Sequence, residues 1–149
     1  MGAGFHMTVG PRLEEVARVN AAFAEFSEAQ AVPLEVRRSM LVVLDELLAN
    51  IISYGLATDG GGEAAIEVVL GAESLTVTLS DNAAAFDPFA RAAPDTTLSV
   101  EERPIGGLGI HLVRHMVDEV SYQRSGDRNV TVLVKRLVAN TSNGSTGEE

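Results

Sequence analysis

Cysteine is absent from the 149 residues, which excludes disulfide bonds and metal sites built from thiolates and fits a reducing compartment. Basic residues are few: 11 lysines and arginines stand against 21 aspartates and glutamates, and the formal charge is -10. Nucleic acids and anionic membranes attract basic surfaces. We therefore expect neither a nucleic acid nor a membrane as a direct partner.

Long apolar runs are also missing, because none approaches the roughly 20 residues that are needed to cross a bilayer. Residues 1–7 lack the basic region and the apolar core of a signal peptide, so we expect a cytoplasmic protein. We interpret these seven residues as a remnant of cloning before a native start near Met7. With 46% hydrophobic residues, residues 8–138 are enough for one domain, and the polar residues 139–149 are predicted to form a disordered tail.

Hydrophobic periodicity predicts helices at the start of the chain and strands later, with one helix between strands. The predicted helices cover residues 11–30, 34–54 and about 110–117, and the predicted strands cover residues 65–71, 74–80, 120–124 and 129–137. Gly55 is expected to end the second helix as its C′ residue. This order indicates an α+β fold, a two-layer sandwich with helices packed on one face of a mostly antiparallel sheet.

A glycine cluster directly precedes the third predicted helix; it consists of Gly106, Gly107, Leu108 and Gly109. A helix start has unpaired N–H groups and a partial positive charge, and glycines let an anion approach them. The cluster therefore predicts a phosphate site, although glycine before a helix is often only a turn. Neither a Walker-type phosphate loop nor a strand directly before the cluster is present, which disfavours the two common nucleotide folds.

The apolar second helix contains few strongly polar residues between positions 40 and 52, namely Asp45, Glu46 and Asn50. Glu46 and Asn50 are four residues apart, so they share one face of the helix. A solvated face is the simple explanation of this pattern. Alternatively, Asn50 offers an oxygen to Mg²⁺, which an acidic nucleotide-binding protein needs, and Glu46 deprotonates a hydroxyl or water.

Two further features lie after the strand pair. Asp81 ends the second strand, where its carboxylate either accepts the exocyclic amine of adenine or caps the turn. The loop of residues 84–105 carries three prolines and is predicted to act as a lid, with Arg103 at its base placed to meet a phosphate. His111 and His115 are one helical turn apart but have no third ligand, so a metal site is not expected there.

Taken together, these segments resemble the Bergerat-type ATP-binding fold shared by gyrase, Hsp90, histidine kinases and MutL. Residues 44–55 are similar to the N-box of that group, residues 80–88 to its first glycine box and residues 103–113 to its second. The pairing of Phe-Asp-Pro with Gly-Gly-Leu-Gly-Ile narrows the resemblance to the compact anti-sigma-factor serine/threonine kinases of bacterial partner-switching systems. It covers residues 8–137.

The resemblance implies ATP and Mg²⁺ as cofactors and assigns the candidate residues their roles. Glu46 would be the general base, Asn50 the Mg²⁺ ligand and Asp81 the carboxylate that reads adenine. Backbone groups of the second glycine box would contact the phosphates, and the implied nucleotide-binding set is completed by Ala83, Arg103, Gly106, Gly107, Leu108 and Gly109. The implied substrate is a STAS-type anti-anti-sigma protein, with a sigma factor and a second copy of the chain as further partners.

One departure from the family pattern favours an alternative. Ala83 and Ala85 stand where the first glycine box usually has glycine, and a methyl group there would crowd the adenine and disfavour a positive φ. The alternative is a non-catalytic regulatory module with weak or absent ATP binding. A third reading, the catalytic domain of a longer histidine kinase, is less favoured because no phosphoacceptor helix is present.

Overall fold

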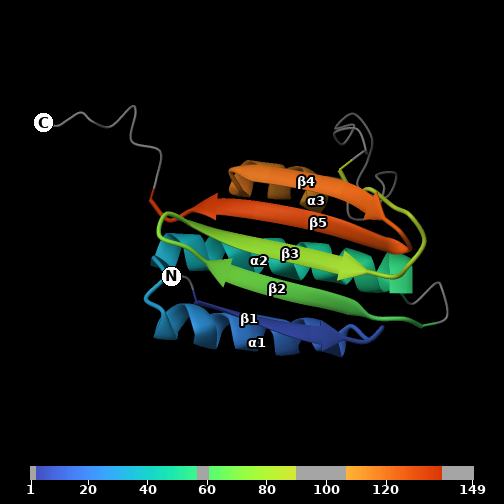
Figure 1. Cartoon of the computed structure of the whole chain (residues 1–149), viewed down its shortest axis with the longest axis horizontal. Helices are drawn as coiled ribbons and strands as arrows, with labels where there is room; N and C mark the ends of the chain where they lie inside the picture. The colour runs from blue at the N-terminus through green and yellow to red at the C-terminus, as the bar shows by residue number, and fades with distance from the viewer. Residues whose placement is uncertain (1–2, 57–60, 90–106, 139–149) are drawn as a thin grey trace, which may run out of the picture.

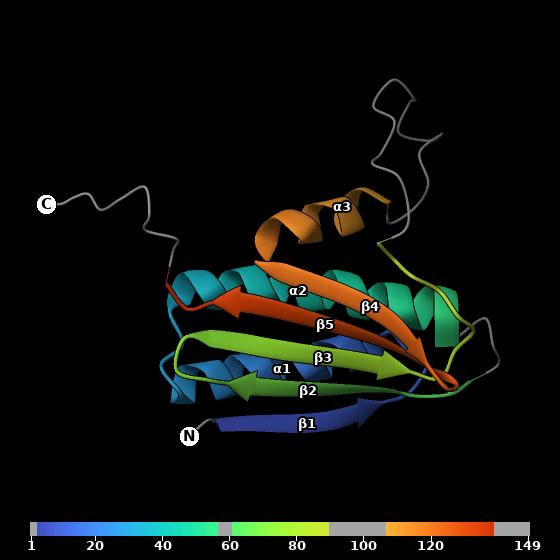
Figure 2. The ribbon, with the colours of Figure 1, turned by 45° about the horizontal axis from the view of Figure 1, so that its top comes forward.

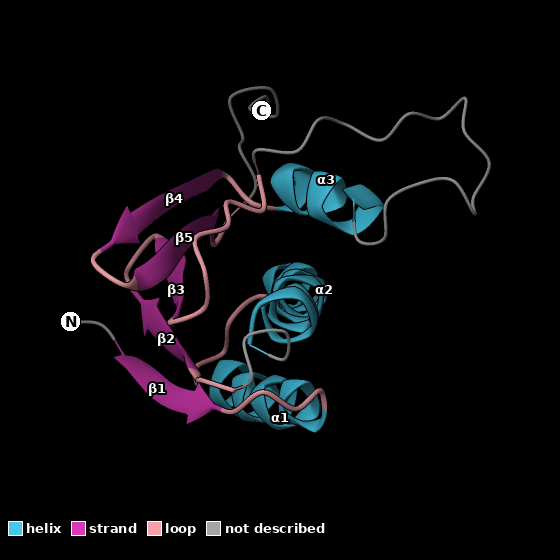
Figure 3. Ribbon diagram, turned by 90° about the vertical axis from the view of Figure 1, so that its right-hand side faces the viewer, coloured by secondary structure: helices cyan, strands magenta, loops and turns pink. Residues whose placement is uncertain are grey.

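The computed structural model describes residues 3–56, 61–89 and 107–138 and consists of two layers (Figure 1). One layer is a sheet of order β1-β2-β3-β5-β4 in which all neighbours are antiparallel. The strands are β1 (Ala3–Val9), β2 (Ala64–Leu70), β3 (Ser74–Asp81), β4 (Glu119–Ser125) and β5 (Arg128–Arg136). The other layer contains α1 (Glu14–Ala29), α2 (Leu34–Ile51) and α3 (Gly107–Met116). Seen along the strands, these helices cover one face of the sheet (Figure 3). The predicted α+β sandwich is confirmed.

The sheet begins earlier than expected from the sequence, with β1 at the edge. Ala3 to Val9 pair with Leu70 to Ala64 of β2, so the sheet includes residues that precede the predicted domain start at residue 8. The signal was the alternation of Phe5, Met7 and Val9, which face the core, with more exposed residues between them. The predicted tail and most of the predicted lid lie outside the described residues.

The second helix does not end at Gly55 as expected. A π-helical turn, Ile52–Leu56, continues α2, and Gly55 is not among the described glycines with positive φ. Ile52 and Leu56 are almost fully buried, so the wider turn carries two more apolar side chains into the core. The hairpin between β4 and β5 is as predicted, and Gly126 in its turn has a φ of 61°.

The continuous helical segment Leu34–Leu56 has a mean hydropathy of 1.5 in its most apolar window and is long enough to cross a membrane. Asp45 and Glu46 interrupt the apolar residues of this segment, so this length reflects the mean hydropathy of the helix and not an unbroken apolar run. In the fold, however, α2 lies between α1 and α3 and packs against the sheet (Figure 3). Because 44% of that window is buried inside the protein, its composition is explained by a place at the centre of the core.

Apolar side chains from α2 and from the inward face of the sheet form the core. Each large side chain that is fully removed from water contributes roughly 1.5–3 kcal/mol. The largest fully buried side chains include Phe23, Met40, Leu44, Leu47, Leu48, Ile52, Leu56, Ile66, Leu75, Leu79 and Leu133. Burial of the second half of α2 fixes the position of Glu46 and Asn50, which lie on the same helix.

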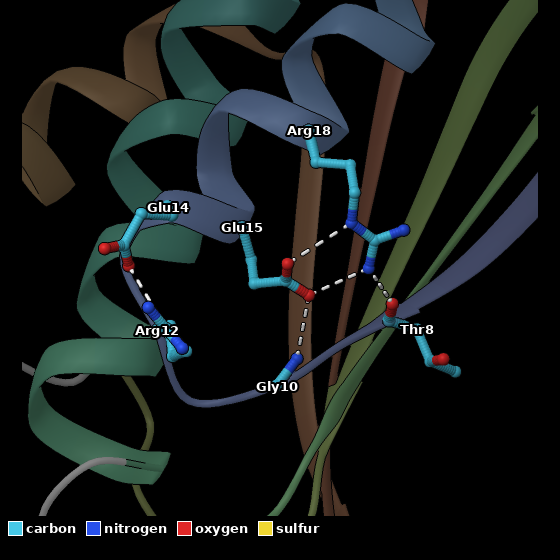
Figure 4. A network of polar contacts seen from close by, with 6 residues as sticks. All are labelled: Thr8, Gly10, Arg12, Glu14, Glu15 and Arg18. Atoms are coloured by element: carbon cyan, nitrogen blue, oxygen red, sulfur yellow. Dashed lines mark hydrogen bonds and ion pairs between the residues drawn. The ribbon is translucent and has the colours of Figure 1, made fainter.

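A polar network ties the end of β1 to the start of α1 (Figure 4). Arg18 donates two hydrogen bonds to the Glu15 carboxylate, at 2.8 and 3.3 Å, and a third to the backbone oxygen of Thr8 at 2.6 Å. The backbone N–H of Gly10 also donates to Glu15, at 3.1 Å. The hydrogen bonds from Arg18 and Gly10 lower the pKa of Glu15 from its ordinary value of 4.5.

This lowered pKa predicts that Glu15 contributes to the pH dependence of stability. The contribution is fully present above pH 4.5 and is lost as the pH falls through the lower pKa of the folded state, because protonation then favours the unfolded chain. Glu15→Gln should remove this part of the dependence. Urea unfolding at several acidic pH values measures it, with Glu25→Gln, an exposed glutamate of the same helix, as the control. Identical pH curves for the wild type and Glu15→Gln would contradict the prediction.

Candidate functional site

Buried polar side chains mark one end of the sheet. Among the described residues, the buried polar or charged ones are Ser27, Asp81, Asn129 and Thr131. Ser27 lies elsewhere and donates its hydroxyl to the carbonyl of Phe23. The other three are each 5% exposed and come from the end of β3 and the start of β5, where Asp81 pairs with Asn129. Burying polar groups is costly unless they are bonded, so their concentration here indicates a site.

These three residues line a pocket between the sheet and the second half of α2. The strand β3 ends, β5 begins and α2 ends at this side of the molecule, on the right in Figure 1. The space amounts to about 440 Å³ when its opening to solvent is counted. The lining residues are Leu47, Asn50, Ile51, Gly55, Leu79, Asp81, Ala83, Ala84, Phe86, Pro88, Asn129 and Thr131. Most of the lining is apolar, with a carboxylate and amides set into it.

Asp81 is held in place by two donors. Its Oδ1 accepts the backbone N–H of Ala83 at 3.0 Å and the side-chain amide of Asn129 at 2.9 Å. Turning the carboxylate about its bond to the chain would break both contacts. The site therefore presents a fixed hydrogen-bond acceptor in the lining of a largely apolar pocket.

The second predicted pair lies at the side of the pocket formed by α2. Asn50 lines the pocket and donates through Nδ2 to the backbone oxygen of Glu46 at 3.0 Å and to its Oε2 at 3.3 Å. Both side chains are half-buried. The helical spacing thus brings them together as predicted, and the carboxylate of Glu46 lies beside the pocket-lining amide.

Ala83 is 3% exposed and packs against the π-helical turn. A Cβ atom added to Gly55 would lie 3.1 Å from the Cβ of Ala83, so the glycine makes room for the alanine methyl. The expected backbone penalty is wrong, because neither Ala83 nor Ala85 has a positive φ; Ala31 is the described non-glycine residue that does. Ala83 is among the residues that line the pocket.

This packing predicts a rescue between the two positions. Gly55→Ala should lower the free energy of unfolding by about 1–3 kcal/mol, the usual cost of an overpacked site. Ala83→Gly in the same chain should restore most of that loss, because it removes the opposing methyl. Denaturant unfolding of the two single variants and the double variant gives the coupling energy. Additive effects would show that the two residues do not compete for the same space.

The second glycine box lies only partly within the described residues. Gly107, Leu108 and Gly109 form the first turn of α3, whereas Arg103 and Gly106 fall outside the described ranges. In Figure 2 the start of α3 is at the same side as the end of β3. Arg114 of this helix donates to the backbone oxygen of Phe89 at 2.8 Å and lies over its ring, which connects α3 to the loop that borders the pocket.

The two histidines of α3 lie next to each other. The rings of His111 and His115 are 4.9 Å apart, but within the described ranges no three His, Cys, Asp or Glu side chains are grouped as a metal site. A cation held by Asn50 would take its other ligands from phosphates and water, as Mg²⁺ commonly does. The donor set therefore fits a magnesium–nucleotide complex better than a free metal ion.

Sequence reasoning missed Asn129 and Thr131. Both lie in the strand predicted over residues 129–137, and alternation from buried Leu133 places them on the inward face. Polar residues on a core-facing side are a signal that could have identified them. What the sequence alone does not show is that Asn129 pairs with Asp81, which is 48 positions away.

The sequence of this chain is similar to those of known proteins. Residues 9–135 match the family described as histidine kinase-like ATPase domain. The chain is 35% identical over 99 residues to the serine/threonine-protein kinase BtrW of Bordetella bronchiseptica, an alignment that covers 65% of this chain and 68% of that protein. It is 25% identical over 136 residues to the serine-protein kinase RsbW of Bacillus cereus, with coverages of 89% and 83%.

Two crystal structures share the fold over 90% of this chain. One contains the RsbU and RsbW domains of Rv1364c from Mycobacterium tuberculosis, with a TM-score of 0.61 and 15% identity; this chain spans 32% of that protein. The other is the SiaB-SiaC complex from Pseudomonas aeruginosa, with a TM-score of 0.58 and 18% identity over 89% of the matched chain. At such identities the likeness concerns the fold alone.

Proposed function

The chain belongs to the histidine kinase-like ATPase domain family, and from that premise we propose that it is an ATP-dependent protein serine/threonine kinase. Its substrate would be a STAS-type anti-anti-sigma protein, and its role would be to regulate transcription in the cytoplasm. The observation that carries the proposal is the buried Asp81 carboxylate in the lining of a largely apolar pocket that Asn50 also lines. The named relatives BtrW and RsbW, both protein kinases, support it.

In this proposal the base of the nucleotide would occupy the pocket. Apolar walls from α2 and β3 would cover the faces of a purine, and the fixed Asp81 carboxylate would accept a hydrogen bond from the exocyclic amine of adenine. We assign Ala83 to the same wall. The phosphates would then extend toward the start of α3, where the backbone N–H groups of Gly107 and Gly109 would bind them; Gly106, Leu108 and Arg103 complete this proposed set.

Chemistry would depend on Glu46 and Asn50. Asn50 uses Nδ2 for its two bonds to Glu46, so its carbonyl oxygen is the atom to offer to Mg²⁺, which neutralises phosphate charge when bound. Glu46 would take the proton from the attacking seryl or threonyl hydroxyl of the partner. Most of the rate acceleration would come from holding the acceptor hydroxyl in position.

A regulatory module without kinase activity is the second candidate. Ala83 and Ala85 favour it, because the family's first glycine box usually has glycine at these positions. Such a module would keep the partner surface, including contacts to a sigma factor or to a second copy of the chain, but would bind ATP weakly.

Two measurements separate the candidates. Calorimetric titration with ATP, with and without Mg²⁺, tests nucleotide binding. Incubation with Mg-ATP and purified STAS-domain proteins, followed by mass spectrometry, tests transfer of a phosphoryl group to serine or threonine. Tight Mg²⁺-dependent binding with transfer supports the kinase. Binding of a STAS-domain protein without nucleotide binding would instead support the module.

A further inference from the structure

Asn129 connects three parts of the pocket through one side chain. Its Nδ2 donates to Oδ1 of Asp81 at 2.9 Å, to the backbone oxygen of Ala84 at 3.0 Å and, more weakly, to that of Ala83 at 3.4 Å. Its Oδ1 accepts the backbone N–H of Phe86 at 3.1 Å and the hydroxyl of Tyr122. A single residue of β5 thus holds the carboxylate at the end of β3 and the loop that follows it.

Only an amide of this size satisfies all of these partners. The carboxylate and the two backbone carbonyls accept hydrogen bonds, so they require the NH₂ group of Asn129, whereas the N–H of Phe86 requires its oxygen. Because Asn129 is 5% exposed, water cannot easily replace the amide if it is removed. The orientation of the side chain is therefore fixed by the groups around it.

We propose that Asn129 is a positioning residue that sets the preference of the pocket for 6-aminopurine over 6-oxopurine nucleotides; this inference rests on the proposed function. With Oδ1 of Asp81 held by Asn129 and by the N–H of Ala83, the carboxylate keeps one orientation toward the ligand. An acceptor fixed in this way pairs with an exocyclic amine and repels a carbonyl oxygen. Without Asn129 the carboxylate can turn, and the discrimination should decrease.

Asn129 also determines where the loop carries its aromatic side chain. Phe86 lines the pocket although it is 48% exposed. Its backbone N–H donates a hydrogen bond to Oδ1 of Asn129. Arg124 supports the same loop by donating to the backbone oxygen of Ala83 at 2.8 Å. A ligand that enters this pocket therefore meets a wall whose position depends on one buried amide.

The test compares ATP with inosine triphosphate, which carries an oxygen in place of the amine, in the wild type and in Asn129→Leu. We expect the ATP affinity of the variant to fall about tenfold or more, while the affinity for inosine triphosphate changes much less, so that the ratio of the two moves toward one. Asn129→Ser, which keeps a small polar group, should give a ratio of affinities between those of the wild type and Asn129→Leu. It replaces Asn129→Leu in the test if that variant does not fold. Asn82→Leu, one residue after Asp81 but exposed and outside the pocket lining, is the matched control and should keep the wild-type ratio.

The outcomes distinguish the inference from the proposed function. Equal losses of both affinities in folded Asn129 variants, or an unchanged ratio, would overturn the positioning role while leaving nucleotide binding intact. If the wild type binds neither nucleotide, the proposed function fails, and base selection by Asn129 fails with it. Hydrogen exchange supplies a second readout: the N–H groups of Ala83 and Phe86 should exchange faster in the variant, and equal protection would also overturn the inference.

Discussion

Replacing Glu46 by glutamine is expected to slow phosphoryl transfer roughly 10²–10⁴-fold, the usual effect of losing a general base. Nucleotide affinity should change little, because glutamine has nearly the same shape and can still accept the bond that Asn50 now donates to Oε2 at 3.3 Å. What is lost is the carboxylate that takes the proton. The measurement is single-turnover transfer from Mg-ATP to a STAS-domain protein, with calorimetry of ATP binding alongside.

Two further variants of the same helix make this result specific. Asp45→Asn removes a neighbouring carboxylate that is exposed and bonded to Asn20 at 3.5 Å, and it should leave transfer unchanged. Asn50→Ala should instead weaken the part of nucleotide binding that depends on Mg²⁺. If Glu46→Gln transfers phosphate as fast as the wild type, Glu46 belongs to a solvated helix face and another group accepts the proton.

The architecture could be predicted from periodicity because most elements bury one face. Leu75, Val77 and Leu79 alternate along β3, and all three are buried in the core of the protein. The apolar stripe of α2 faces the sheet. The family expected from the three motifs is confirmed. Elements fail to be predicted where local rules compete with burial, as in the π-helical turn, which continues through Gly55 because Ile52 and Leu56 are buried there.

The site could be predicted only where its residues are close in sequence. Glu46 and Asn50 are one helical turn apart, so their contact follows from helix geometry. The contact between Asp81 and Asn129 depends instead on β5 inserting between β3 and β4, a pairing that local patterns do not specify. The packing of the Ala83 methyl against Gly55 could not be predicted for the same reason, since Gly55 lies far away in the sequence.

Asp81→Asn should reduce ATP affinity by about 1–3 kcal/mol, the cost of mispairing one buried polar group. The two N–H donors at Oδ1, from Ala83 and Asn129, require an oxygen there, so the new amide must turn its NH₂ group toward the ligand. That group would oppose the amine of adenine but would pair with the oxygen of a 6-oxopurine.

Inosine triphosphate should therefore bind Asp81→Asn at least as well as it binds the wild type, and the unfolding midpoint should change little because the side chains have nearly equal size. Calorimetric titrations with both nucleotides measure this exchange of preference. Thr131→Val, which alters another buried residue of the pocket lining without touching the carboxylate, should not invert the order of the two nucleotides. An Asp81→Asn variant that binds ATP as tightly as the wild type would mean that the base is read by a group other than this carboxylate.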